Sequence, residues 1–166
     1  MQSHTTTVKH LPAGSGRSFA LMGSALTFKT EPAENDDTLL AFEHDCPAGL
    51  GVPLHKERNH EAFYVLEGTL EVDADGERYR LELGDFLSVA PGTIHALHNP
   101  GPSRARVLTM VAPGSGHVRL FTTLGEPIED PANPPHATTP PDFERVSRIA
   151  HECGIDFLPP EGDDDA

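Results

Sequence analysis

The sequence predicts an all-β fold, a barrel or two-sheet sandwich, followed by one C-terminal amphipathic helix. The chain has 166 residues, which suits one domain with a substantial core. From Ser18 to Ala112, short β-branched and aromatic runs alternate with Gly, Pro, Asn and Asp at intervals of roughly ten residues. After residue 141 the apolar residues instead recur at helical spacing. These observations place a β-domain first and a helix after it.

Each short run between turns is expected to form one strand. The best-defined reversal is Asp73-Ala74-Asp75-Gly76, where Gly76 suits the positive φ of a tight turn between two alternating runs. Because an open sheet leaves unpaired edges, a closed or two-sheet barrel is favoured. The expected strands are 18–22, 26–30, 38–44, 52–57, 61–67, 69–73, 77–83, 86–90, 94–98 and 104–112.

The pattern changes beyond Gly116. Residues 117–124 fit a short helix or a last strand, and a Pro-rich connector follows. Asp142 is a suitable N-cap and Gly154 a suitable C-terminal cap for the final helix, whose apolar stripe must dock on its own barrel or on a neighbouring subunit. That stripe comprises Phe143, Val146, Ile149, Ala150 and Cys153. The expected segments are a flexible N-terminal stretch 1–16, the barrel 17–124, the connector 125–141, the helix with its extension 142–158, and an acidic tail 159–166.

Composition argues against several classes of partner. The chain has 12 Lys and Arg against 26 Asp and Glu, a net charge of −14 with neutral histidines, so its surface should repel nucleic acid and anionic lipid. Its apolar runs are far shorter than the roughly 20 residues that cross a bilayer, and a secretory signal pattern is absent, so a cytoplasmic location is expected. Cys46 and Cys153 lie far apart in different contexts and are expected to be free thiols.

A small group of His and Glu residues could perform chemistry. In a strand over 52–57, His55 and Glu57 share one face, and His95 lies on the inner face of the strand 94–98. Two histidines and one carboxylate on one side of a metal form a centre that suits Fe, Mn, Ni, Co or Zn. Glu61 opens the next strand on an apolar face, where a buried carboxylate needs a partner such as a cation. The alternative is an exposed strand pair and a histidine satisfied within a turn.

Two separated stretches carry a distinctive spacing of Gly, His, Glu and Pro residues. The first reads Gly49, five residues, His55, one residue, Glu57, three residues, Glu61, six residues, Gly68. The second reads Gly84, five residues, Ala90, Pro91, Gly92, two residues, His95, three residues, Asn99. Together they resemble the two motifs of the cupin superfamily. The resemblance implies a cupin-type double-stranded β-helix barrel (jelly roll), a divalent metal bound by His55, Glu61 and His95, and a homodimer paired through its sheets.

The first stretch departs from the cupin pattern at Glu57, where that family has a second histidine. Glu57 could act as a ligand, or the site could bind metal poorly. Without a cation, one of the two carboxylates, Glu57 or Glu61, should take up a proton. His60 is a spare candidate that strand alternation places outside the barrel. Ala90 replaces a usual proline, a minor change that a turn absorbs.

The region from about Arg17 and the Pro-rich tail also resemble cupins of the quercetin-dioxygenase-like group. That likeness implies a small organic substrate activated toward dioxygen by the metal, with Glu61 as the catalytic base. Glu57 is a second candidate catalytic residue. Apolar walls that exclude water are expected from Phe63, Val65, Phe86 and Leu97. The alternatives are a non-redox isomerase, cyclase or decarboxylase that uses Glu57 or Glu61 for proton transfer, and a metal-independent barrel that binds a small ligand.

The remaining histidines lack ligand spacing, so surface positions are expected for His4, His10, His44, His117, His136 and His151. The sequences Gly14-Ser15-Gly16 and Gly114-Ser115-Gly116 lack the strand and helix context of a phosphate-binding loop. They are expected to be turns.

Overall fold

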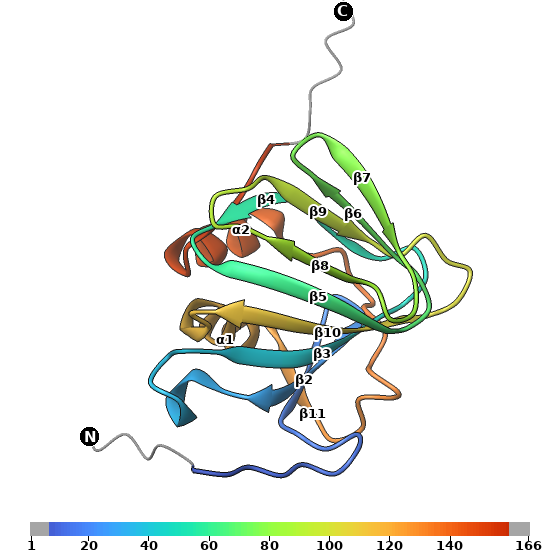
Figure 1. Cartoon of the computed structure of the whole chain (residues 1–166). Helices are drawn as coiled ribbons and strands as arrows, with labels where there is room; N and C mark the ends of the chain where they lie inside the picture. The colour runs from blue at the N-terminus through green and yellow to red at the C-terminus, as the bar shows by residue number, and fades with distance from the viewer. Residues whose placement is uncertain (1–6, 160–166) are drawn as a thin grey trace, which may run out of the picture.

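A computed structural model describes residues 7–159 and places them in two antiparallel sheets (Figure 1). The larger sheet has the order β11-β1-β2-β3-β10-β5-β8, and the smaller has the order β12-β4-β9-β6-β7. The strands of the larger sheet are β11 (Glu126–Ile128), β1 (Ser18–Leu21), β2 (Ser24–Thr30), β3 (Leu40–Cys46), β10 (Ala105–Ala112), β5 (His60–Glu67) and β8 (Phe86–Val89). Those of the smaller sheet are β12 (Ile155–Phe157), β4 (Gly51–Glu57), β9 (His95–His98), β6 (Leu70–Ala74) and β7 (Glu77–Leu81).

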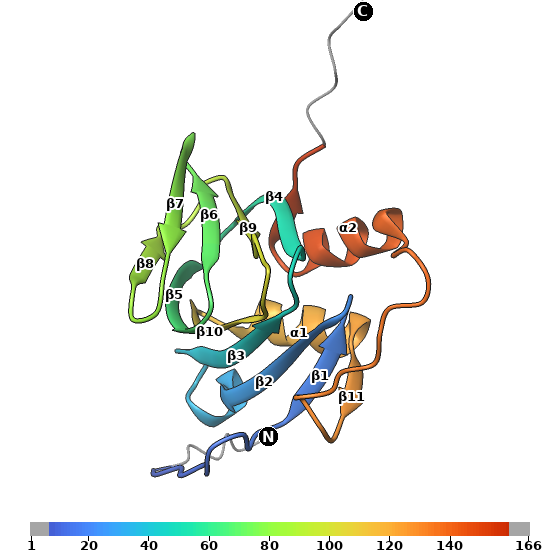
Figure 2. The ribbon, with the colours of Figure 1, turned by 90° about the vertical axis from the view of Figure 1, so that its right-hand side faces the viewer.

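Each expected strand is present, with ends that agree to within two residues. The β6–β7 hairpin closes as the turn sequence predicts, with Ala74 opposite Glu77. Asp75 and Gly76 take φ angles of 51° and 79° at its tip, the left-handed backbone of a two-residue hairpin turn. The all-β barrel is therefore confirmed. The strands enclose a barrel that is best seen end-on (Figure 2).

Two apolar clusters form the core. The first fills the barrel between the sheets, and its most buried members are Phe63, Val65 and Val72. The second packs β1, β2 and β3 against the C-terminal elements around Phe28 and Phe42. Strand alternation accounts for this division, since one face of each strand points inward while the other faces solvent or a helix.

The C-terminal third covers one side of the barrel. Helix α1 (Ser115–Leu124) follows β10 directly, so of the two forms expected for 117–124 the helix is correct. Within the Pro-rich connector, β11 pairs with β1 and places Pro127 opposite Phe19, a strand that the sequence did not predict. The strand β11 has only three residues and contains a proline, so its sequence shows no alternating pattern. Proline is tolerated here because β11 is an edge strand.

Helix α2 (Phe143–Glu152) docks on its own barrel. The Asp142 carboxylate accepts a hydrogen bond of 3.0 Å from the Arg145 backbone N–H, as expected for an N-cap. Val146 and Ala150 are buried, whereas Phe143 is exposed. After the helix, β12 pairs with β4 and thereby adds the C-terminus to the smaller sheet. Of the two docking surfaces that the sequence allowed, the helix therefore uses its own barrel, and a neighbouring subunit is not needed to bury it.

A short 3-10 helix that the sequence did not predict spans Pro32–Glu34. Cys46 and Cys153 are both free and buried. No helix between residues 7 and 159 is long and apolar enough to span a membrane. The acidic residues 161–165 and His4 lie outside the described residues.

Candidate metal centre

Five buried histidine and glutamate side chains meet inside the barrel, near the end of β10. His55 and Glu57 come from β4, Glu61 from β5, His95 from β9 and His117 from α1. Each is at most 5% exposed. Histidine and glutamate rarely reach such burial without a partner, so the cluster is chemically distinct from the apolar core beside it.

Strand geometry explains how the barrel residues meet. His55 and Glu57 share the inner face of β4 because side chains two positions apart point the same way. The register then sets His55 opposite His95 in β9, with their ring centroids 4.1 Å apart. Phe157 in β12 flanks His55 at a centroid distance of 5.7 Å, so the C-terminal strand forms part of the wall.

Both barrel histidines are held through the same ring nitrogen. The Nδ1 atom of His55 lies 2.8 Å from the Pro53 carbonyl oxygen, and Nδ1 of His95 lies 2.9 Å from that of Thr93. A carbonyl oxygen only accepts, so in each ring Nδ1 carries the hydrogen. In the neutral rings Nε2 is then left with a free lone pair, and backbone hydrogen bonds of this kind fix the orientation of histidine ligands. Burial lowers the pKa of His55 to about 4, which keeps this imidazole neutral.

The Nε2 atom of His95 lies 2.9 Å from Oε2 of Glu61. Because Nδ1 of His95 already donates to Thr93, a neutral imidazole would aim a lone pair at the carboxylate. A proton or a cation between the two atoms removes that repulsion. Burial opposes the charged form of each group, yet contact with Glu61 raises the pKa of His95, and burial raises the pKa of Glu61. The pair therefore binds a proton strongly when no cation is present.

Glu57 has the least satisfied carboxylate in the site. Its Oε2 atom lies 3.0 Å from Nε2 of His117 and 4.0 Å from Nε2 of His55. The shorter contact has ion-pair distance but lacks hydrogen-bond alignment, so within residues 7–159 neither oxygen of Glu57 accepts a hydrogen bond. Burial opposes ionisation, but the neighbouring His117 lowers the pKa of Glu57. The result is a buried carboxylate that is charged and has unused lone pairs.

These residues fit a divalent metal ion. His55, Glu61 and His95 each offer a ligand atom within 4.8 Å of the others, and so do Glu57, Glu61 and His117. Ligand atoms about 2.1 Å from one octahedral ion lie about 3.0 Å apart when adjacent and about 4.2 Å apart when opposite. The separations of 2.9 Å (His95–Glu61), 3.0 Å (His117–Glu57) and 4.0 Å (His55–Glu57) lie within these limits. Mixed imidazole and carboxylate ligands suit Fe, Mn, Ni, Co or Zn, as expected from the sequence.

The structure brings together all four residues that the sequence proposed as ligands, His55, Glu57, Glu61 and His95. Their role as ligands stays a prediction. His60 is exposed, as strand alternation predicts.

His117 also lies in this cluster, although it was not among the site residues predicted from the sequence. The surface position expected for it is wrong, because the residue is 5% exposed and faces Glu57. It comes from a helix far along the chain from the four candidate ligands, where strand periodicity gives no information. Its one local signal is Gly114-Ser115-Gly116, which forms the start of α1 instead of only a turn. Of the other histidines expected at the surface, His44 is partly buried, while His10, His136 and His151 are exposed.

The expected apolar walls need correction at Phe86. Phe63, Val65 and Leu97 are buried in the barrel core, but Phe86 is 59% exposed. Phe86 pairs with Tyr64 on the outer face of the larger sheet, and the alternation in β8 turns Leu87 inward instead.

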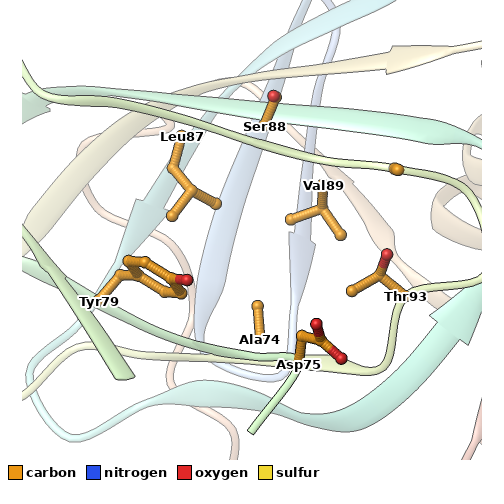
Figure 3. Close-up of a pocket in the computed structure, with 8 residues that line it drawn as sticks. Ala74, Asp75, Tyr79, Leu87, Ser88, Val89 and Thr93 are labelled. Atoms are coloured by element: carbon orange, nitrogen blue, oxygen red, sulfur yellow. The ribbon is translucent and has the colours of Figure 1, made fainter. Parts of the chain in front are cut away.

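A pocket of about 320 Å³ lies next to the cluster. It opens between β8 and β7, the last strands of the two sheets, and Leu87, Val89 and Tyr79 point into it while Ser88 turns away (Figure 3). Two lining residues are direct neighbours of the cluster in register, since Val89 pairs with Glu61 and Ala74 pairs with His95. The lining is completed by Asp75, Ala90 and Thr93. Its size suits a small organic molecule.

Known proteins resemble this chain in sequence and in fold. Residues 42–111 match the cupin domain family. The chain is 33% identical to quercetin 2,3-dioxygenase of Bacillus subtilis over 111 residues, which cover 66% of this chain and 32% of that protein. It is 36% identical to the tetracenomycin polyketide synthase protein TcmJ of Streptomyces glaucescens over 72 residues, 43% of this chain and 48% of that protein. The chain thus spans less than half the length of either relative.

The solved structure of an RmlC-like cupin from Shewanella frigidimarina has a similar fold, with a TM-score of 0.57 at 21% identity. The match covers 67% of this chain and 96% of that one. At this level of identity, the likeness concerns the fold alone.

Proposed function

Because this chain belongs to the cupin superfamily, we propose that it is a divalent-metal-dependent enzyme, a dioxygenase-like oxidoreductase that acts on a small organic molecule inside the barrel. One observation carries the proposal. Nε2 of His95 and Oε2 of Glu61 lie 2.9 Å apart, with His55 beside them, and the Nδ1 atoms of both rings are already engaged. That arrangement leaves ligand atoms of the right kind converging at a buried point.

A bound metal would supply Lewis-acid and redox chemistry at this point. The chain's own residues have separate tasks. His55 and His95 orient their Nε2 atoms through backbone hydrogen bonds. Glu61 is the proposed base: burial raises the pKa of its carboxylate, which makes it a better proton acceptor than an ordinary glutamate. Phe63 and Val65, fully buried in the same strand, keep water away from it.

The pocket beside Val89 and Ala74 is the proposed substrate site. Leu87 and Val89 offer apolar contact, while Tyr79 and Asp75 place a hydroxyl and a carboxylate at the same opening. A flat phenolic molecule suits such walls, because its ring packs on the aliphatic side chains while its hydroxyls reach polar groups. The name of the Bacillus subtilis relative makes quercetin the first compound to assay.

A second candidate function is favoured by Glu57. Both of its oxygens lack a hydrogen-bond donor within residues 7–159, so the carboxylate is free to take a proton from a substrate. With Glu61 close by, the site holds two carboxylates that differ in pKa, as acid–base catalysis requires. The reaction would then be a non-redox isomerisation, cyclisation or decarboxylation.

Two measurements separate these candidates. Protein purified without chelators is analysed for metal, and oxygen uptake is then followed with quercetin, simpler phenols and diketones. We expect one metal per chain and oxygen uptake that Glu61→Gln abolishes, whereas Glu67→Gln, at the exposed far end of the same strand, leaves it intact. Metal without oxygen uptake would favour the proton-transfer enzyme. A chain that neither contains metal nor takes it up when offered would overturn the proposal.

We further propose that the chain forms a homodimer in the cytoplasm. Tyr64 and Phe86 form an exposed aromatic pair on the outer face of β5 and β8, and Leu83 nearby along the chain is also exposed. Joining such faces would bury this apolar surface. A reducing cytoplasm also suits the two free cysteines. Sedimentation velocity should give a dimer that Phe86→Ser weakens; a monomer at micromolar concentration would contradict this.

A further inference from the structure

Helix α1 begins against the cluster, and four hydrogen bonds hold it there. The Asp37 carboxylate accepts hydrogen bonds from the backbone N–H groups of Gly114 and Ser115, at 3.1 and 2.9 Å. It also accepts one of 2.8 Å from the Ser115 hydroxyl. The buried Asn59, in the turn between Glu57 and Glu61, donates to the Pro113 carbonyl just before the helix. The turn between the two strands that carry the carboxylates is therefore tied to Pro113, just before the start of α1.

Small residues allow this close approach. A Cβ atom on Gly114 would lie 2.3 Å from Cβ of Leu40, and one on Gly116 would lie 2.3 Å from the Cys153 carbonyl oxygen. Real Cβ atoms do not approach other atoms so closely. Glycine at these two positions lets the first turn of α1 sit between β3 and the end of α2. His117 follows Gly116 directly, so the packing of this turn against β3 and against the end of α2 fixes its position.

The side chain of His117 completes the set of ligand atoms around Glu57. Its Nε2 atom lies 3.0 Å from Oε2 of Glu57, and its ligand atom lies within 4.8 Å of those of Glu57 and Glu61. Glu61 also belongs to the set with His55 and His95. The two sets thus share one carboxylate. Oε2 of Glu57, which accepts no hydrogen bond within residues 7–159, lies 3.0 Å from Nε2 of His117 and 4.0 Å from Nε2 of His55.

We propose that His117 is a further ligand of the metal, so that one ion is held by three histidines, His55, His95 and His117, and two glutamates, Glu57 and Glu61. This inference rests on the proposed function, because it adds a residue to the same metal centre. It assigns a binding role to a helix outside the barrel strands. The C-terminal part of the chain then becomes part of the metal centre as well as a cover for the barrel.

Charge favours one ion over two. Glu57 and Glu61 together carry two negative charges, which one divalent cation balances. Two divalent cations would leave a surplus of two positive charges among side chains that are almost fully buried, and uncompensated charge is strongly disfavoured there.

The test uses Co(II) as the probe, because its affinity and its visible spectrum can both be measured. Chelator competition gives the Co(II) affinity of the wild type, His117→Gln and His60→Gln, the last removing an exposed imidazole next to Glu61. We expect His117→Gln to weaken Co(II) binding about 100-fold or more, since losing even an outer-shell partner costs roughly 10- to 100-fold. His60→Gln should bind like the wild type. Circular dichroism of the metal-free proteins shows that the variants fold.

A second measurement needs no variant. Pulsed electron paramagnetic resonance of the wild type loaded with one Cu(II) counts coordinated imidazoles, and we expect three. Two imidazoles, or equal Co(II) affinity in the wild type and a folded His117→Gln, would overturn the role of His117 and leave the metal centre itself standing. Two tightly bound Co(II) ions per chain would overturn the single-ion arrangement. If the wild type binds no Co(II) at all, the proposed function fails and this inference with it.

Discussion

The contact of 2.9 Å between Nε2 of His95 and Oε2 of Glu61 joins the two sheets, because β9 belongs to the smaller sheet and β5 to the larger. Whether this contact attracts or repels depends on what lies between the two atoms. A proton or a cation makes it attractive, whereas a neutral imidazole facing a bare carboxylate repels. Binding of a proton or a cation at this contact should therefore change the stability of the whole barrel.

Metal binding is expected to stabilise the fold. A ligand that binds only the folded chain adds about 2.7 kcal/mol at a concentration 100 times its Kd. For a chain of this size that corresponds to a rise in Tm of roughly 5 to 10 °C. Differential scanning calorimetry with and without Co(II) checks this, and a chelator should reverse the rise. His95→Ala should show no rise; an equal rise in the variant would place the binding site elsewhere.

Acid should destabilise the metal-free protein through His55. Its pKa is about 4 in the fold, below the unfolded value of 6.5, so the unfolded chain takes up a proton first as pH falls. Stability from the neutral imidazole is fully present above pH 6.5 and is lost as pH falls from 6.5 toward 4. Between pH 7.5 and 5 this amounts to about 2 kcal/mol.

Urea unfolding at those two pH values, in the presence of a chelator, measures the effect. His55→Gln keeps a polar side chain of similar length but cannot titrate, so its loss of stability should be smaller than that of the wild type by this amount. An identical loss in both proteins would show that His55 does not carry the pH dependence.

Most of the barrel could be predicted from sequence because its information is local. Strand periodicity and turn residues predicted the ends of β1 to β10 to within two residues, and the same periodicity placed His55 and Glu57 on one inner face. The motif spacing then linked these residues to Glu61 and His95, which no local pattern could have done. In this part of the chain, local pattern and fold agree.

The failures share one physical cause, which is dependence on tertiary contacts. His117 reaches the site only because α1 packs against β3 and the end of α2, and nothing in the sequence of the helix states which side is covered. Phe86 has an apolar side chain of the kind found in protein cores, but its pairing with Tyr64 places it on the outer face of the sheet. The strand β11 exists because β1 offers a free edge to a short Pro-containing segment.

Asn59 is expected to support the centre from outside it. Asn59→Ala leaves the Pro113 carbonyl oxygen without its donor, and we expect a loss of about 1 to 3 kcal/mol in the free energy of unfolding. The Co(II) affinity should also fall, because the tie between the β4–β5 turn and α1 is lost. Asn133→Ala removes a comparable amide that donates to Asp130 at the surface, and should change neither quantity. Equal behaviour of the two variants in urea unfolding would show that the buried hydrogen bond contributes nothing particular.

Gly116→Ala should destabilise the protein, opposite to the usual effect of this change. Inside a helix, alanine normally stabilises by roughly 0.5 to 1 kcal/mol relative to glycine. Here the added Cβ would lie 2.3 Å from the Cys153 carbonyl oxygen, so α1 must move away from the end of α2 and carry His117 with it. We expect a loss of about 1 to 3 kcal/mol, as for other overpacked sites, together with weaker Co(II) binding. Thr123→Ala, at an exposed position of the same helix, is the matched control and should be neutral or slightly stabilising. If Gly116→Ala stabilised the chain and kept its Co(II) affinity, the close approach that positions His117 would be wrong.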